Sequence, residues 1–461
     1  MPGLPFDYTL VRGLTFSLVI CLGLYPISAQ AGSSSSDPLD NWQQWRGPLA
    51  TGFAPRGNPP LRWDDHTNIR WKAPIAGRGS ATPIIWGDQV FVLTAVDTGR
   101  AADAADLPTA DGKLPKKTKP PTTYHRFLVL ALDRWTGKVR WQRIATEQVP
   151  HEGHHPTHSY AAASPSTDGK YLYASFGSQG VYCYDMAGTL RWKRDLGRMQ
   201  TRLGWGEGAS PTLHGDALIV NWDQEVGSFL TVLDARTGET RWKVARDEPT
   251  SWATPLAVEH NGRTQVIVNG TNRVRSYDLA TGAVIWQCGG QTVNAIPSPV
   301  RVGALAICMS GYTGSAAYAI PLEATGDLTG TSRVAWHYDR GTPYVPSPLL
   351  MGDRLYFTGA NGPMLTTLDV HTGKPLIDRA RLPGLTSLYA SPAAAADRMY
   401  FVGRDGTTLV LRSGDKLDVL ATNRLNDPVD ASPAIVGDQL FLRGEKYLYC
   451  IEETAAAVKD H

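Results

Sequence analysis

A short block that opens with Ser-Pro or Thr-Pro recurs eight times at regular spacing along this chain of 461 residues. The blocks begin at Thr82, Ser164, Ser210, Thr254, Ser298, Ser347, Ser391 and Ser432. From the second block onward the steps between these numbers are 46, 44, 44, 49, 44 and 41 residues. A period of about 40 to 45 residues is typical of arrays built from repeated four-stranded units. The chain is therefore expected to fold as one array of eight units, with an insertion in the longer first step.

The residues between the blocks also repeat in a fixed order. Two strands joined by a Gly-Asp turn come first, and the second of them alternates apolar and polar side chains, as in residues 354–358. A third strand ends in Asp, and a Gly and a Trp follow at steps of four residues, as in Asp133, Gly137 and Trp141. This order predicts an all-β fold, an eight-bladed β-propeller of four-stranded antiparallel blades.

The repeated tryptophans are expected to dock neighbouring blades against one another. The Asp accepts N–H groups of the turn, the Gly supplies a positive φ, and the indole buries a large aromatic surface. The alternative, that these indoles form a cofactor site, is disfavoured by their regular spacing. The docking tryptophans are Trp71, Trp141, Trp192, Trp242, Trp286 and Trp336.

The last unit lacks a closing Trp, whereas residues 69–75 precede the first block and resemble an outer strand. We therefore expect this N-terminal strand to pair with the C-terminal blade and close the ring. Closure removes the exposed sheet edges that an open array would have to protect.

The N-terminus has the pattern of a cleavable signal peptide over residues 1–31, with an apolar run from Leu14 to Leu24 and the small-x-small sequence Ala29-Gln30-Ala31. An uncleaved anchor is the alternative, although the run is shorter than the roughly 20 residues needed to span a bilayer. Ile20 before Cys21 argues against a lipid anchor. A periplasmic or secreted product without a transmembrane segment is expected, with a flexible linker at 32–40, a propeller at 41–456 and a tail at 457–461.

Composition narrows the choice of partners. Lys and Arg total 45 and Asp and Glu total 43, so the net charge of +2 gives no strong field for nucleic acid. The remaining cysteines, Cys183, Cys288, Cys308 and Cys450, lack CxxC spacing and are expected to be small buried side chains, with a bridge between Cys288 and Cys308 as the alternative. The insertion, residues 97–124, is rich in Ala, Asp, Lys, Pro and Thr and is expected to be a mobile loop.

The Asp, Thr-Gly and Trp units resemble the tryptophan-docking repeats of pyrroloquinoline-quinone (PQQ)-like propellers, over roughly residues 41 to 453. The opening sequence Trp42-Gln-Gln-Trp-Arg-Gly-Pro48 is similar to that of exported bacterial propellers that are mostly functionally unassigned. The resemblance implies the β-propeller fold. It leaves the function open between quinoprotein dehydrogenases and non-enzymatic members such as the assembly lipoprotein BamB.

The dehydrogenase branch would imply a quinone over a tryptophan floor, calcium held by Glu, Asn and Asp, and a disulfide between adjacent cysteines. This sequence has no adjacent cysteines and no CxxCH haem signature. Glu207, Asp223 and Asn294 are the residues that could serve as calcium ligands under this interpretation.

Candidate site residues fall on the loops that join one blade to the next and on the loops between second and third strands, which share one face of the ring. The sequence from His151 to His158 contains four of the 11 histidines, and we weigh a transition-metal site there against a solvated loop. Its possible ligands are His151, His154, His155 and His158. Third-blade and equivalent loop positions supply the ligand-binding candidates Arg202, Trp205, Glu207, Trp222, Asp223, Trp252, Asn294, Tyr344, Tyr389, Arg404 and Asp430.

The leading hypothesis is a monomeric binding or scaffold propeller that takes a protein, peptide or carbohydrate of the cell envelope on this face. A PQQ- and calcium-dependent dehydrogenase with a degenerate site is the alternative. Hydrolase or lyase chemistry at the histidine loop is disfavoured because no nucleophile arrangement accompanies it.

Overall fold

The computed structural model describes residues 3, 35–108 and 114–454 of the chain. Apart from Gly3, the predicted signal peptide lies outside the described residues, and so does the predicted tail. Residues 35–108 and 114–454 form eight sheets, each with four antiparallel strands, arranged as an eight-bladed β-propeller, as the repeat predicted. Within the described residues no helix is long and apolar enough to cross a bilayer.

The first four blades follow the chain in order, and each runs from the channel outward. Blade 1 contains β3 (Ile84–Trp86), β4 (Gln89–Ala101), β5 (Thr123–Asp133) and β6 (Val139–Gln148). Blade 2 contains β7 (Ser166–Thr167), β8 (Tyr171–Ser175), β9 (Val181–Asp185) and β10 (Leu190–Arg194). Blade 3 contains β11 (Thr212–His214), β12 (Ala217–Trp222), β13 (Phe229–Asp234) and β14 (Thr240–Ala245). Blade 4 contains β15 (Leu256–His260), β16 (Arg263–Val268), β17 (Arg273–Asp278), β18 (Val284–Gly289) and the parallel edge strand β22 (Gly326–Asp327).

The other four blades repeat the arrangement. Short 3-10 turns lie at Pro38–Asp40, before the first blade, at Gly177–Gln179 in blade 2 and at Gly359–Asn361 in blade 6. Blade 5 contains β19 (Val300–Val302), β20 (Leu305–Ser310), β21 (Ala316–Pro321) and β23 (Trp336–Tyr338). Blade 6 contains β24 (Leu349–Met351), β25 (Arg354–Thr358), β26 (Met364–Asp369) and β27 (Pro375–Arg381). Blade 7 contains β28 (Ala393–Ala395), β29 (Arg398–Val402), β30 (Thr407–Arg412) and β31 (Val419–Arg424), with β1 (Phe53–Ala54) parallel to β28. Blade 8 contains β32 (Ala434–Val436), β33 (Gln439–Arg443), β34 (Tyr447–Ile451) and β2 (Ile69–Pro74).

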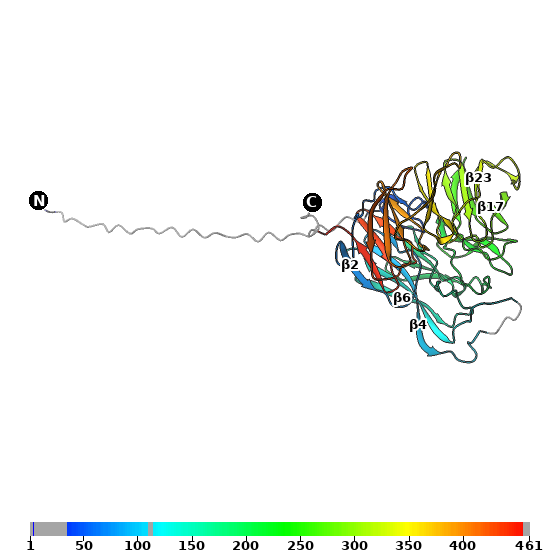
Figure 1. Cartoon of the computed structure of the whole chain (residues 1–461). Coiled ribbons are helices and arrows are strands. Elements are labelled where there is room, and N and C mark those ends of the chain that lie inside the picture. Colours follow the sequence, from blue (N-terminus) through cyan, green and yellow to red (C-terminus); the bar gives the residue numbers. More distant parts are fainter. Residues whose placement is uncertain (1–2, 4–34, 109–113, 455–461) are drawn as a thin grey trace. The chain divides into compact units, whose positions relative to one another are not determined.

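The N-terminal strand closes the ring, which confirms the prediction for residues 69–75. β2 pairs with β34 in antiparallel register, with Trp71 opposite Cys450 and Pro74 opposite Tyr447. Figure 1 shows β2, in blue, beside the red strands of the C-terminal blade. Two segments more than 370 residues apart thus complete one sheet. The edge of β34 is covered by β2, which becomes the outer strand of the blade.

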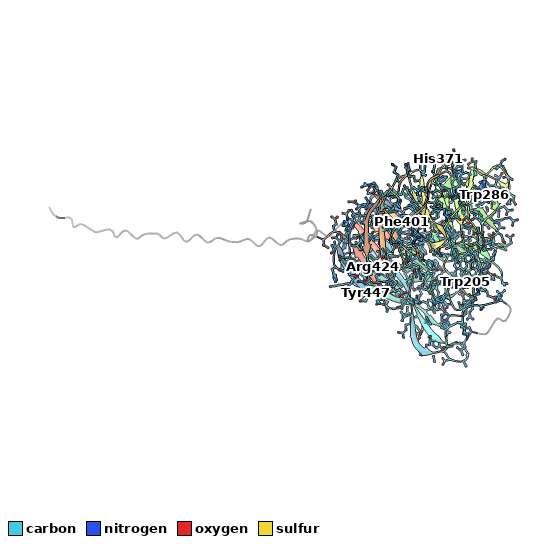
Figure 2. All side chains as sticks on the ribbon, in the orientation of Figure 1. Trp205, Trp286, His371, Phe401, Arg424 and Tyr447 are labelled. Atoms are coloured by element: carbon cyan, nitrogen blue, oxygen red, sulfur yellow. The ribbon has the colours of Figure 1, made fainter. Side chains whose placement is uncertain are left out.

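Five of the six repeated tryptophans cover a glycine of the next blade. A Cβ on Gly137, whose φ is +70°, would lie 2.6 Å from the indole of Trp71, so only glycine fits under this ring. The indole N–H of Trp71 also donates to the carbonyl of Arg134, at 2.8 Å. Trp141, Trp192, Trp242 and Trp336 make the same pair of contacts with the following blade. Trp286 differs, because its fully buried indole donates to Gln265 of its own blade; Figure 2 labels this residue.

The strands of the first blade extend into both ends of the insertion. β4 continues to Ala101 and β5 begins at Thr123, so the two strands project as an arm beyond the other blades (Figure 1). Arg100 lies over the ring of Tyr124 at 3.5 Å and is ion-paired with Glu147. These cross-strand contacts stabilise the paired ends of β4 and β5, although the composition of the insertion does not suggest strands.

A segment before the first blade occupies the centre of the ring, and we call residues 42–54 the plug. Trp42 exchanges two backbone hydrogen bonds with Ile85 of blade 1, and Thr51 accepts one from Leu350 of blade 6. The buried guanidinium of Arg46 donates to the carbonyls of Pro392, at 2.7 Å, and Pro348, at 2.9 Å. The plug therefore ties together the inner strands of blades that are distant in sequence.

The Ser and Thr residues of the repeated blocks form a ring of hydrogen bonds around the channel, which we call the girdle. The backbone N–H of Ser347 donates to the hydroxyl of Ser391 at 2.8 Å, and the N–H of Ser391 donates to the hydroxyl of Ser432 at 2.9 Å. The same link joins Thr82 to Ser164, Ser164 to Ser210, Ser210 to Thr254, and Ser298 to Ser347. In these six links the hydroxyl satisfies a buried N–H of the preceding blade, which gives a reason for Ser or Thr in the repeat. The hydroxyl of Ser298 accepts from the indole of Trp45 instead, and that of Thr82 has no partner among the described residues.

The four described cysteines are free and buried. The alternative bridge between Cys288 and Cys308 is not formed, and both side chains lie in the hydrophobic core between blades 4 and 5. Burial raises the pKa of the Cys288 thiol to about 11, so this thiol is protonated and unreactive at neutral pH.

Candidate functional site

A cavity of about 320 Å³ opens at the centre of the ring, on the face formed by the loops that join one blade to the next. This volume is at the lower end of the range for small-molecule sites, roughly 300 to 1,000 Å³. Every one of the eight blade-to-blade loops contributes at least one residue to its lining. The lining includes Ser80, His155, Thr157, His158, Trp205, Trp252, Ile296, Tyr344, Tyr389 and Asp430, together with Tyr312 from a loop within blade 5.

The floor of the cavity consists of Trp45 from the plug and hydroxyls of the girdle. The indole N–H of Trp45 donates to the hydroxyl of Ser298 at 2.9 Å, so the ring is held in one orientation. The girdle residues that line the cavity are Ser210, Thr254, Ser298, Ser347, Ser391 and Ser432. The cavity is therefore a cup whose base combines an aromatic face with hydrogen-bonding oxygens.

One wall of the cup is a continuous row of aromatic rings. His155 packs edge-on against Trp205 with ring centroids 6.1 Å apart, and Trp205 packs edge-on against Tyr312 at 6.3 Å. Tyr312 in turn lies 4.7 Å from Tyr344. Trp252 is fixed beside this row because its indole N–H donates to the carbonyl of Gly206.

The loop that carries Trp205 is held by a tight turn and by the arm of blade 1. The N–H of Trp205 donates to the carbonyl of Arg202, and the two residues between them, Leu203 and Gly204, both have positive φ. The N–H of Lys117 in the arm donates to Leu203, and the hydroxyl of Thr118 donates to Gly204 at 2.5 Å. The arm thus positions one wall of the cavity, and Figure 2 labels Trp205 close to the arm.

The opposite wall carries an ion pair. The guanidinium of Arg404 donates two hydrogen bonds to Asp430, at 2.6 and 3.1 Å, and lies over the ring of Tyr389 at 4.1 Å. The Tyr389 hydroxyl accepts a long hydrogen bond from Thr157, at 3.4 Å. The negative charge of Asp430 is neutralised by Arg404, so this wall presents a paired charge and an aromatic face.

The four histidines of residues 151–158 each have a separate hydrogen-bond partner. His151 Nε2 contacts the carbonyl of Met199, His154 Nδ1 that of His155, and His155 Nδ1 the hydroxyl of Thr157. His158 Nε2 lies 2.8 Å from the carbonyl of Glu207, and burial lowers the pKa of His158 to about 4, so its ring is neutral and donates this bond. Among residues 35–108 and 114–454, no group of three or more His, Cys, Asp or Glu side chains is placed to bind a metal.

Two of the three residues considered as calcium ligands are engaged in other contacts. Both carboxylate oxygens of Glu207 accept hydrogen bonds from Ser178, and both oxygens of Asp223 accept hydrogen bonds from the buried guanidinium of Arg246. Asn294 lies on the loop after β18, between blades 4 and 5. These side chains do not form one oxygen cage, and the described cysteines are all free. The residues present therefore do not fit the calcium and disulfide arrangement of the quinone dehydrogenases.

Some of the sequence-derived candidates line the cavity and others do not. Arg202, Glu207, Asp223, Asn294, His151 and His154 are outside its lining. Trp205, Trp252, Tyr344, Tyr389, Asp430, His155 and His158 line the cavity. Arg404 lies directly behind this lining, in contact with Asp430. Trp222 is buried in a core cluster and stacks on Phe229, with ring centroids 5.6 Å apart. Sequence reasoning missed Trp45, although the clustering of Trp and Gln in residues 42–45 was a usable signal.

Comparison with known proteins agrees with the fold. Residues 125–329 match the family model described as outer membrane protein assembly factor BamB. No curated protein is detectably similar in sequence.

Among solved structures, BamB from Moraxella catarrhalis is 16% identical over 80% of this chain and 99% of its own, with a TM-score of 0.51. A europium-containing methanol dehydrogenase is 9% identical over 88% of this chain and 90% of its own, with a TM-score of 0.59. The quinohemoprotein alcohol dehydrogenase ADHIIG from Pseudomonas putida HK5 is 11% identical over 91% of this chain and 81% of its own, with a TM-score of 0.55. At these identities the structural likeness concerns the fold alone.

Proposed function

Since this chain is a β-propeller of the PQQ-like family, we propose that it is an exported binding protein that holds a carbohydrate in its central cavity. The protein binds its ligand without transforming it. The match to an outer-membrane assembly factor supports a place in the cell envelope.

The observation that carries the proposal is the chemistry of the cup. Its walls present the faces of Trp205, Tyr312 and Tyr344, and its floor presents the indole of Trp45 above a ring of hydroxyls. A sugar ring has an apolar C–H face that packs on aromatic rings and an edge of hydroxyls that exchange hydrogen bonds with polar groups. The cup offers both kinds of contact within one enclosed volume.

The rigidity of the lining also supports binding. The indole of Trp45 is fixed by Ser298 and that of Trp252 by Gly206, both through hydrogen bonds. A site whose aromatic rings are already ordered loses little side-chain entropy when a ligand binds.

The test is a screen of envelope and exopolysaccharide oligosaccharides with the full-length mature protein, followed by calorimetry and tryptophan fluorescence. We expect at least one saccharide to bind and to perturb the fluorescence. Trp205→Ala should weaken binding about tenfold or more, because stacked aromatic residues dominate such sites. Trp135→Ala is the matched control, because Trp135 lies in the turn between β5 and β6, on the other face of the ring. Absence of binding to every saccharide, or equal effects of the two substitutions, would contradict the proposal.

The quinone dehydrogenase alternative is tested with the same protein. Addition of pyrroloquinoline quinone and calcium should cause neither a thermal shift nor dye-linked alcohol oxidation, since Glu207 and Asp223 are committed to Ser178 and Arg246. A saturable quinone titration accompanied by alcohol oxidation would replace the binding proposal with the enzymatic one.

Export is tested by mass spectrometry of the protein from the periplasmic and secreted fractions of its host. The expected mature chain begins after Ala31. A product that keeps residues 1–31 and stays with the membrane would show an uncleaved anchor instead.

A further inference from the structure

A buried carboxylate lies behind the aromatic wall of the cavity. Glu152 is 4% exposed and belongs to the loop between β6 and β7, outside the lining that the described residues form. Its Oε2 accepts two hydrogen bonds from Thr201, one from the backbone N–H at 3.0 Å and one from the hydroxyl at 2.6 Å. Its Oε1 lies 3.2 Å from the ammonium group of Lys116 in the arm. The carboxylate is therefore both hydrogen-bonded and ion-paired, as a buried charge has to be.

Thr201 connects this carboxylate to two tryptophans that line the cavity. Its hydroxyl donates to Glu152 and accepts the N–H of Gly206 at 3.0 Å. Gly206 follows Trp205 directly in the sequence, and its carbonyl accepts the indole N–H of Trp252 at 2.7 Å. These hydrogen bonds run without a break from Glu152 to the indole of Trp252, and the backbone of Trp205 belongs to the segment that they hold.

The arm packs against the loop between blades 1 and 2 and against the loop between blades 2 and 3. Lys116 forms a parallel β-bridge with Leu203, two residues before Trp205. The carbonyl of Lys119 is so close to Gly153 that a Cβ on this glycine would lie 2.4 Å from it. Loops are more mobile than strands, so the orientation of this wall depends on such contacts. The buried ion pair joins the arm and both loops at one point.

We propose that Glu152 is a positioning residue for the cavity. Through Thr201 it holds Trp205 and Trp252 in the orientation that binds a sugar ring, with Lys116 of the arm as its counter-ion. This inference rests on the proposed function, because it assigns the two indoles to saccharide binding. An aromatic ring that is fixed before binding loses little entropy when the saccharide arrives. Removal of the carboxylate should therefore lower the affinity, although Glu152 itself acts from outside the lining.

The first test needs no saccharide. The mature protein is labelled with 5-fluorotryptophan, and the fluorine resonance of Trp205 is assigned by its loss in Trp205→Phe. We expect Glu152→Ala to shift or broaden this resonance, because the loop of Trp205 loses its anchor. The resonance of Trp141, assigned in the same way, should stay unchanged, since this indole is held by the carbonyl of Met186 in the next blade.

Glu147→Gln is the matched control for the loss of a glutamate charge. Glu147 is ion-paired with Arg100 and Arg126 at the base of the same arm, and it lies on β6, outside the cavity lining. We expect this variant to keep the wild-type resonance of Trp205 and the wild-type affinity for saccharides.

The second test measures affinity by calorimetry, with cellotetraose, maltotetraose and chitotetraose as probes. For a probe that the wild-type protein binds, Glu152→Ala should weaken binding about tenfold, because the probe must then order both indoles. Thr201→Val keeps the shape of the side chain, removes the link to Gly206 and should weaken binding to a similar degree. Glu152→Gln keeps one carbonyl oxygen for Thr201 and should weaken binding less. It also replaces Glu152→Ala if that variant does not fold.

A double-mutant cycle distinguishes positioning of the indoles from general support of the fold. If Glu152 acts through Trp205, Glu152→Ala should weaken binding less in the Trp205→Ala protein than in the wild type, because only the part that acts through Trp252 remains. Fully additive losses would show that Glu152 supports the fold without positioning the indole, and would overturn the inference. Thermal melting checks that each variant is folded.

The remaining outcomes separate this inference from the binding proposal. If saccharides bind and Glu152→Ala has the wild-type affinity, or if Glu147→Gln has the same effect as Glu152→Ala, the protein binds carbohydrate but Glu152 is not a positioning residue. If neither the three probes nor any saccharide of the wider screen binds, the proposed function fails. The fluorine resonance of Trp205 then decides alone, and an unchanged resonance in Glu152→Ala would overturn the inference as well.

Discussion

The floor and the mouth of the central channel are built by the same eight blades and have opposite chemistry. At the floor, the guanidinium of Arg46 bonds to carbonyls of two blades, and the girdle hydroxyls accept N–H groups of neighbouring blades. At the mouth, the rings of Trp205, Tyr312 and Tyr344 form an aromatic row, and Tyr312 is 40% exposed. Contacts at the floor therefore hold the blades together, whereas the mouth presents aromatic side chains to solvent, where we propose that a ligand binds.

The largest effect on stability is expected at the floor. Arg46→Ala removes the donor for the carbonyls of Pro348 and Pro392 and leaves a hole in the plug. We expect the free energy of unfolding to fall by about 3 kcal/mol or more. Urea denaturation measures the loss, and Arg56→Ala is the control. The ion pairs of Arg56 with Asp37 and Asp40 are exposed and screened by solvent, so its removal should leave the midpoint of urea denaturation close to that of the wild type. Equal losses would show that the plug does not hold the ring together.

A single girdle hydroxyl should have a smaller effect. Ser391→Ala leaves the buried N–H of Ser347 without an acceptor, and we expect a loss of about 1 to 2 kcal/mol. The exposed Ser332 gives a matched control, because Ser332→Ala deletes a hydroxyl on the surface. A thermal melt of the Ser391 variant that matches the wild type would mean that the girdle does not contribute to stability.

Between floor and mouth, Glu207 should give the stability a pH dependence. Burial raises the pKa of Glu207 to about 7, above its ordinary value of 4.5. Between these values the unfolded chain releases the proton while the folded protein keeps it, so this group lowers stability as the pH rises. The glutamine of Glu207→Gln cannot ionise, so the variant does not lose stability through this group as the pH rises.

The measurement for Glu207 is the melting temperature of variant and wild type at several pH values. The advantage of Glu207→Gln should grow as the pH rises through the window between 4.5 and 7. His158, whose pKa is lowered to about 4, acts in the opposite direction in both proteins, because the unfolded chain takes up its proton as the pH falls below 6.5. A difference in melting temperature that does not vary with pH would contradict the assignment.

The smallest effect on stability is expected at the mouth. Tyr312 is 40% exposed, so Tyr312→Ala should change the free energy of unfolding by less than about 0.5 kcal/mol. The same substitution should weaken saccharide binding, because Tyr312 joins Trp205 to Tyr344 in the aromatic row. Calorimetry measures binding and denaturation measures stability. If the Tyr312 variant is clearly destabilised yet binds saccharide normally, Tyr312 serves stability rather than binding, and the comparison of floor and mouth is wrong.

The regular features of this protein were predictable because they depend on neighbours in the sequence. The four-residue steps from Asp133 to Gly137 to Trp141 encode a turn and a docking indole, and their repetition predicts the number of blades. The missing Trp of the last unit and the likeness of residues 69–75 to an outer strand were also enough to predict the strand that closes the ring. The extension of β4 and β5 into the ends of the insertion was not predicted, because it depends on contacts such as that of Arg100 with Tyr124, which composition does not reveal.

The sequence alone determined the all-β class, the eight blades, their order and the face that carries unusual side chains. Only the tertiary structure decided which of those side chains share a cavity, and that the plug forms its floor. The physical reason is separation along the chain. Arg46 and Pro392 are 346 residues apart, and the cavity draws residues from every blade-to-blade loop, so no local pattern encodes their meeting. Closure of the ring brings these loops to one axis, where aromatic side chains and girdle hydroxyls line one cavity.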